Sequence, residues 1–315
     1  MNVIPLAADS LGVRSMATYV ECGQTRILID PGAVLAPNRF GLPPADEEWE
    51  ALRRANDRIS AYASRAGVIF LSHYHEDHFR HDPGLYQGRT VWAKDARRMI
   101  NPRQAQRAAD LWKSIGGVCR LDSAEGRVLE TAEARLSASP PLAHGAEGTG
   151  LGYIVALTVT DLREGKRFVH ASDVQGPLSA VAAAYLIRER PDLLYLSGPP
   201  AYLESQIGPA LIEQGVDQLL RIVDQTGCRV ILDHHALRAE SYPERFHRLW
   251  QTGRVMTAAG FMGLDDAALE SRRRSLWARK RKPASPMGAR LKSPRRSAMI
   301  DRRQEIPRAR GGTVE

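Results

Sequence analysis

Residues 73–78, His-Tyr-His-Glu-Asp-His, limit what this chain can fold into more than any other segment. They follow a continuous apolar run at residues 67–72, which predicts a buried strand. Side chains alternate in direction along an extended segment, so we expect His73 and His75 to point into one cavity. Imidazole and carboxylate ligands suit Zn, Fe(II) or Mn(II), and the absence of cysteine argues against a structural zinc site. Three histidines in an ordinary turn would repel one another or need separate partners, so we interpret the segment as metal-binding.

Short apolar runs and amphipathic stretches alternate through residues 1–270. We expect strands at residues 19–20, 26–29, 67–72, 90–93, 135–138, 153–159, 167–170, 193–196 and 229–232. We expect helices at residues 46–65, 102–115, 178–190, 209–225 and 243–251. The loop at residues 163–166 predicts a hairpin, whereas strands and helices alternate after Asp173. Antiparallel strands with helices on their outer faces indicate a layered α/β sandwich.

The C-terminal segment, residues 271–315, differs from the rest of the chain in charge. It holds 15 Lys or Arg and 3 Asp or Glu residues, so it supplies the whole net charge of +8 and leaves residues 1–270 mildly acidic. Few of its residues are apolar and its like charges repel, so folding cannot offset its ordering entropy. We therefore expect one domain at residues 1–270 and a disordered basic tail, with at most a weak, non-specific contact with nucleic acid or anionic surfaces.

The expected compartment is the cytoplasm. Cys22, Cys119 and Cys228 are odd in number and far apart, which is typical of reduced thiols and not of a disulfide framework. No run approaches the roughly 18 to 20 apolar residues that cross a bilayer, so we expect no membrane partner. The first residues lack the basic start and apolar run of a signal peptide.

At its His-x-His-x-Asp-His segment the chain resembles the metallo-β-lactamase-fold superfamily of hydrolases. Four further motifs of that superfamily have counterparts in the same order and after predicted strands: Asp30-Pro31-Gly32, His144 in a Gly-containing loop, Asp173, and the pair His234-His235. The resemblance covers roughly residues 1–265. It implies a four-layer αββα sandwich that holds two divalent metal ions, zinc in preference to manganese or iron.

The resemblance also divides the ligands between two metal ions. The first metal would be held by His73, His75 and His144, the second by Asp77, His78 and His234, and Asp173 would bridge them. Water between two divalent ions has its pKa lowered from 15.7 towards about 7, and the hydroxide attacks a carbonyl or a phosphorus. Asp77 and Asp173 would then be the catalytic carboxylates, acting as ligands.

Three residues beside these ligands leave alternatives open. In the tRNA-processing nucleases of the superfamily, an Arg stands four residues after the last ligand His; Arg238 has that spacing from His234, which favours His234 over His235 as the ligand. His170 lies on an expected strand and is interpreted as a core residue or a support for a ligand. Asp30 is expected to orient a ligand histidine through its other ring nitrogen.

The amino-acid sequences of four segments indicate a smaller family within the superfamily, but they do not indicate a substrate. Residues 10–21, 72–75, 170–177 and 197–200 are similar to an uncharacterised protein family of predicted metal-dependent hydrolases (family 0282). About 60 residues separate Asp173 from the last His pair, too few for the cap domain of the RNA-cleaving branch of the superfamily.

Arginines supply the one indication of substrate class. Arg97, Arg98, Arg103 and Arg107 would place cations near the site if they do not simply form a solvated helix face. We expect a small-molecule or phosphoester substrate, with a phosphodiester or phosphate ester favoured over a lactone or thioester. Two alternatives are a non-catalytic, nucleic-acid-associated binding protein, which would lack ligands, and a di-iron redox protein, which would replace His75 with Glu.

Overall fold

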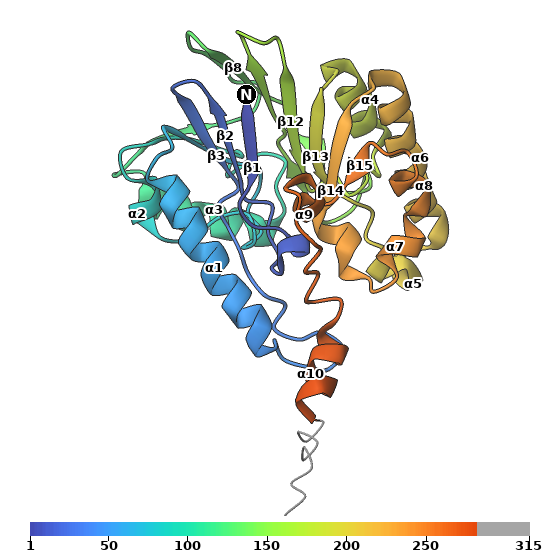
Figure 1. Ribbon diagram of the computed structural model, residues 1–315. Helices are drawn as coiled ribbons and strands as arrows, with labels where there is room; N and C mark the ends of the chain where they lie inside the picture. The colour runs from blue at the N-terminus through green and yellow to red at the C-terminus, as the bar shows by residue number, and fades with distance from the viewer. Residues whose placement is uncertain (282–315) are drawn as a thin grey trace, which may run out of the picture.

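Two β-sheets face each other in the computed structural model, which describes residues 1–281 (Figure 1). The first sheet has the order β1-β2-β3-β4-β5-β6, with bounds Asn2–Pro5, Thr18–Cys22, Thr25–Ile29, Val68–Leu71, Thr90–Ala93 and Arg120–Ser123. The second has the order β15-β14-β13-β12-β11-β8-β7, with bounds Val255–Met256, Arg229–Asp233, Leu193–Ser197, Arg167–Ser172, Leu157–Asp161, Ala134–Ala138 and Val128–Glu130. Strands β3 to β6 and β12 to β15 run parallel within their sheets.

Helices cover both outer faces of this pair of sheets. Helices α1 (Asp46–Ala63) and α3 (Pro102–Ile115) pack on the first sheet, and α4 (Ala180–Glu189) and α6 (Pro209–Thr226) pack on the second (Figure 1). Shorter helices are α2 (Pro83–Tyr86), α5 (Glu204–Ile207), α7 (Tyr242–Arg245), α8 (His247–Trp250) and α9 (Ala258–Phe261). The predicted four-layer αββα sandwich of the metallo-β-lactamase fold is therefore confirmed.

Strand β4 shows why the sequence folds into layers. Val68 and Phe70 pack into the apolar layer between the sheets, whereas Ile69 and Leu71 pack under α1 and α3. A strand covered on both faces needs a continuous apolar run, which residues 67–72 supply. This burial fixes the strand end from which residues 73–78 emerge.

Two predicted elements are interrupted. Residues 153–159 form two strands, β10 (Tyr153–Ile154) and β11, because β10 leaves the large sheet to pair with β9 (Leu142–Ala143). Between them, the Val155 N–H donates to the Ser72 carbonyl of the opposite sheet at 3.0 Å. Residues 243–251 form α7 and α8 instead of one helix, with the fully buried Phe246 at the break.

The predicted start of a disordered tail at residue 271 is wrong. Residues Arg273–Arg281 form helix α10, and the guanidinium of Arg273 is fully buried, 2.7 Å from the Glu48 carboxylate of α1. The Trp277 indole also donates to the Pro43 carbonyl. Charge counting missed this helix because composition does not reveal contacts with distant segments such as Glu48 and Pro43. The rest of the predicted tail, residues 282–315, lies outside the described residues.

No helix within residues 1–281 is long and apolar enough to cross a membrane.

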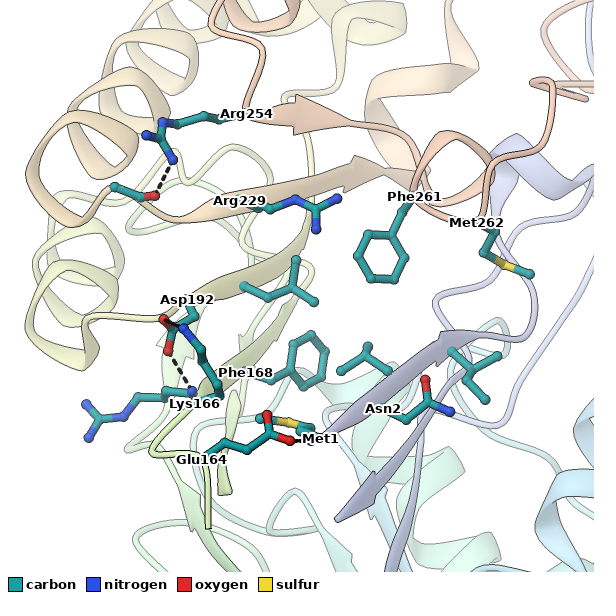
Figure 2. Close-up of a pocket in the computed structure, with 15 residues that line it drawn as sticks. Met1, Asn2, Glu164, Lys166, Phe168, Asp192, Arg229, Arg254, Phe261 and Met262 are labelled. Atoms are coloured by element: carbon teal, nitrogen blue, oxygen red, sulfur yellow. Dashed lines mark hydrogen bonds and ion pairs between the residues drawn. The ribbon is translucent and has the colours of Figure 1, made fainter. Parts of the chain in front are cut away.

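A pocket of about 720 Å³ opens where β12, β13 and β14 begin, and Phe168, Arg229 and Phe261 are among the residues that line it (Figure 2). Asp173 and His234 follow the other ends of β12 and β14, so this pocket is separate from the candidate site.

Candidate metal centre

The loop after β4 is folded tightly against the loop after β3. A Cβ atom at Gly32 would lie 2.5 Å from the backbone nitrogen of His78 and 2.4 Å from that of Phe79, so only glycine fits there. Asp30 accepts hydrogen bonds from the Ser72 N–H at 2.8 Å and the Ser72 hydroxyl at 2.6 Å. The Asp-Pro-Gly motif thus holds the start and the end of the His-rich loop in place.

Four side chains form a first group of candidate ligands: His73, His75, His144 and Asp173. The Nε2 atom of His73 lies 3.0 Å from the Nδ1 atom of His75, and Nε2 of His144 lies 3.2 Å from Oδ2 of Asp173. His144 follows β9, so the interrupted strand described above brings it to the loop after β4. The group draws on both sheets.

Asp77, His78 and His234 form a second group. Nε2 of His234 lies 3.3 Å from Oδ2 of Asp77, and Nε2 of His78 lies 4.0 Å from Oδ1 of Asp77. Asp173 stands between the groups, since its Oδ2 lies 3.5 Å from Nε2 of His78 and its Oδ1 lies 3.6 Å from Nε2 of His234. The structure therefore brings together all seven residues predicted as ligands.

The donor atoms fit divalent cations. Nε2 of His78 and Oδ1 of Asp173 are buried without a hydrogen-bond partner in the described chain, as expected for atoms that face an ion. Burial, with the neighbouring His78, lowers the pKa of His73 well below its usual value, and burial, with His144, lowers that of His75 to about 4. Both rings are then neutral at pH 7, which leaves lone pairs for a metal.

Polar partners hold the ligand rings from behind. The predicted role of Asp30 has the contact that it requires, because its Oδ2 lies 2.9 Å from Nδ1 of His78. Asp9 supports His234 in the same way, since Oδ2 of Asp9 lies 2.7 Å from Nδ1 of His234. The Gln104 amide lies 3.4 Å from Nε2 of His75. Such contacts fix the ring orientation and the tautomer of a ligand histidine.

Asp30 allows a test of this support. In the Asp30→Asn variant the backbone conformation is retained, because Asn tolerates the positive φ of 47° found there, but the carboxylate that faces His78 is lost. We expect the affinity for zinc to fall about 10- to 100-fold. Competition with a chromogenic chelator measures it, and exposed Asp265→Asn is the control; equal affinities of the two variants would show that Asp30 is not a support.

The two candidates after β14 both face Asp173. His235 Nε2 lies 3.2 Å from Asp173 Oδ2, and its Nδ1 lies 2.8 Å from the Tyr202 hydroxyl. Only His234 also contacts Asp77, which agrees with the preference for His234 in the second group. His170 belongs to none of the ligand groups found in the described residues; it is a buried core residue, 3.2 Å from the Met16 carbonyl.

Arg238 contributes more than its spacing suggested. It is buried, and its Nε donates to Asp9 at 3.1 Å. Its Nη2 lies 3.2 and 3.0 Å from the two ring nitrogens of His234. The guanidinium therefore packs against the imidazole ring and does not point at one of its nitrogens. The sequence alone pointed to neither Asp9 nor Gln104 nor Tyr202, because each reaches the site from a distant segment and none belongs to a ligand motif.

Backbone strain is concentrated at this centre. Of the seven non-glycine residues with positive φ in the described chain, four are at or beside it: Asp30, Ser172, Gln175 and His234. A register shift in the pairing of β12 with β13 between His170 and Ser172 accompanies the turn towards Asp173. Strain of about 1–3 kcal/mol per residue persists where the surrounding structure holds it, and it is typical of functional sites.

Known proteins provide an independent comparison. No protein-family model matches the chain. A UPF0282 protein of Thermococcus gammatolerans is 41% identical over 297 residues, covering 89% of this chain and 96% of the relative. A UPF0282 protein of Methanocaldococcus jannaschii is 36% identical over 290 residues, covering 88% and 96%. These relatives match most of the chain.

Solved structures align at much lower identity. Unliganded yeast PDE1 aligns with a TM-score of 0.48 at 11% identity, covering 81% of this chain and 97% of that chain. Tm1679, described as a metal-dependent hydrolase of the β-lactamase superfamily, aligns with a TM-score of 0.46 at 14% identity, covering 81% and 94%.

Proposed function

The chain belongs to the UPF0282 family, and we propose that it is a metal-dependent hydrolase of phosphoesters that holds two divalent ions, preferably zinc. The observation that carries the proposal is the pair of ligand groups that meet at Asp173, seven imidazole and carboxylate side chains without a thiolate. Such a donor set suits Zn, Mn or Fe(II). His73, His75 and His144 would hold one ion, Asp77, His78 and His234 the other, and Asp173 would contact both.

The protonation state and the supporting contacts of the candidate ligands suit a hydrolytic metal centre. Two divalent ions, when bound, supply hydroxide at neutral pH by lowering the pKa of water. Neutral His73 and His75 leave their lone pairs free, while Asp30 and Asp9 fix the rings of His78 and His234. His75 and Asp77 are the only partly exposed members of the seven, so substrate would approach from their side.

A basic groove beside His75 favours an anionic substrate. It has a volume of about 440 Å³ and is lined by His75, Arg103 and Arg107, among others. Arg103 has no acidic partner within residues 1–281, whereas Arg107 lies 3.5 Å from Glu76. Arg97 and Arg98 line no part of this groove. Guanidinium groups recognise phosphate oxygens well, which supports a phosphoester over a lactone or thioester.

The experiment is a turnover screen of zinc- and manganese-loaded protein on bis-p-nitrophenyl phosphate, a lactone and a thioester, after metal analysis. We expect hydrolysis of the phosphodiester. Metal-free protein without turnover would contradict the hydrolase proposal and favour a binding protein, and a coloured iron centre would favour redox chemistry. Turnover of the lactone or the thioester alone would contradict the phosphoester assignment.

The groove makes a separate prediction. Arg103→Gln removes a cation without an acidic partner, so we expect the KM for the phosphodiester to rise about 10-fold. We expect kcat to be nearly unchanged, as for a contact that is equally strong in the ground state and the transition state. Steady-state kinetics measure this, and Arg53→Gln on the exposed face of α1 is the control. A KM equal to that of the control would show that Arg103 does not bind the substrate.

A further inference from the structure

A second cavity, of about 190 Å³, adjoins the same centre on another side. His75, His144 and His235 form the part of its wall that belongs to the site. Much of the remaining wall is apolar and comes from Leu178, Pro200, Leu203, Ile207 and Leu211. A cavity of about 150 Å³ with apolar walls can hold a benzene ring. This pocket therefore has room for one ring or a short alkyl chain directly beside the ligand histidines.

Gln175 is the polar side chain in this wall that lacks a partner. The Tyr202 hydroxyl is paired with His235 and the Thr149 hydroxyl with the Ala146 carbonyl. The Gln175 backbone N–H donates to the Ser197 hydroxyl, but within residues 1–281 its side-chain amide has no hydrogen bond. The residue is only 5% exposed.

The backbone and the neighbours of Gln175 hold this amide in place. The residue has a positive φ of 54°. A Cβ atom at Gly145, next to His144, would lie 2.5 Å from the amide oxygen, so glycine is needed for the amide to lie there. An amide that is held at the pocket wall in this way, without a partner among the described residues, is available to hydrogen-bond to a ligand.

We propose that this pocket binds an apolar ester group of the substrate, a short alkyl chain or one aromatic ring, and that the Gln175 carboxamide hydrogen-bonds to the substrate at the pocket mouth. The inference rests on the proposed function, since it assigns the substrate of the same centre. The substrate class is then a phosphoester with an apolar group on one side of the phosphorus, while the groove at Arg103 faces the other part of the molecule.

Binding of phosphonates tests the pocket without relying on turnover. Zinc-loaded wild-type protein is titrated calorimetrically with methyl-, propyl-, butyl- and phenylphosphonate. Since each buried methylene contributes, we expect the Kd to fall about two- to fourfold per added methylene. Equal affinities across the series would overturn the proposal.

Two variants separate the contributions of the wall and of the amide. Leu211→Trp fills the pocket, so the preference for butyl- over methylphosphonate should disappear, whereas Leu264→Trp on an exposed loop should retain it. Gln175→Leu retains volume but not hydrogen bonding, so phosphonate affinity should fall about 5- to 10-fold at unchanged zinc content. Unchanged affinity in Gln175→Leu would show that the amide does not hydrogen-bond to the ligand.

Turnover distinguishes this inference from the proposed function. Turnover of methyl p-nitrophenyl phosphate is compared between zinc-loaded wild-type protein and Leu211→Trp. Equal kcat/KM values for the two proteins would overturn the pocket and leave the hydrolase standing. Graded phosphonate binding without any hydrolysis would uphold the pocket and overturn the hydrolase.

Discussion

The Asp173→Ala variant is expected to lose bound metal and hydrolytic activity together. Asp173 lies within 3.7 Å of Nε2 atoms in both ligand groups, from His73 and His144 on one side to His78 and His234 on the other. On the proposed function, its removal takes a ligand from each of the two metal positions at once. We expect the zinc content to fall from about two ions per chain to fewer than one, and kcat/KM to fall by more than the roughly 100-fold typical of a supporting residue.

Elemental analysis after dialysis and steady-state kinetics measure the two losses. Asp224→Ala, on an exposed position of α6, is the matched control and should keep both properties. Because Asp173 is buried, circular dichroism must show that the variant is folded. Full zinc occupancy in a folded Asp173→Ala protein would rule out the role of Asp173 as a shared ligand.

A second large effect is expected far from the metal centre, in the Arg273→Met variant. The side chains of Arg273 and Glu48 are 0% and 1% exposed, so this substitution leaves a carboxylate buried without its counterion. Breaking a buried ion pair in this way costs about 3–5 kcal/mol, and we expect the free energy of unfolding to fall by that amount. Urea denaturation of the full chain provides the measurement.

Two further variants show whether the ion pair is responsible. Arg279→Met removes a charge from an exposed position of α10 and should change the free energy of unfolding by less than about 0.5 kcal/mol. The double variant Glu48→Met with Arg273→Met removes both charges and should recover most of the loss. If Arg273→Met were no less stable than Arg279→Met, α10 would not be anchored by this pair.

The fold and the ligand groups could be predicted because their signals are local. Residues 67–72 form a continuous apolar run, as a strand covered on both faces requires. The His-x-His-x-Asp-His segment is recognised from the spacing of residues that are close together in the sequence. Asp30, His144, Asp173 and the pair after β14 each follow a strand, and they were collected because they match, in the same order, the motifs of the superfamily that the chain resembles. The spacing of Arg238 favoured His234 over His235, and the contact of His234 with Asp77 lies in the folded structure only.

The remaining features depend on contacts between distant segments. Asp9 reaches His234 across 225 positions, and Glu48 reaches Arg273 across the same number. An aspartate in the first ten residues or an arginine in a basic run has no local property that reveals such a partner. The break in residues 153–159 was hidden for the same reason, since its cause is a pairing with β9 and a contact with Ser72.

The division of the ligands between the sheets has a consequence for folding. His73, His75, Asp77 and His78 follow a strand of the first sheet, whereas Asp173 and His234 follow strands of the second. Neither half of the chain carries a complete set, so on the proposed function tight metal binding would require that the halves are docked. By linkage, a metal bound only by the docked state would stabilise that state against separation of the halves. Loosening a residue of the apolar layer between the sheets, such as Phe70, would then weaken metal binding.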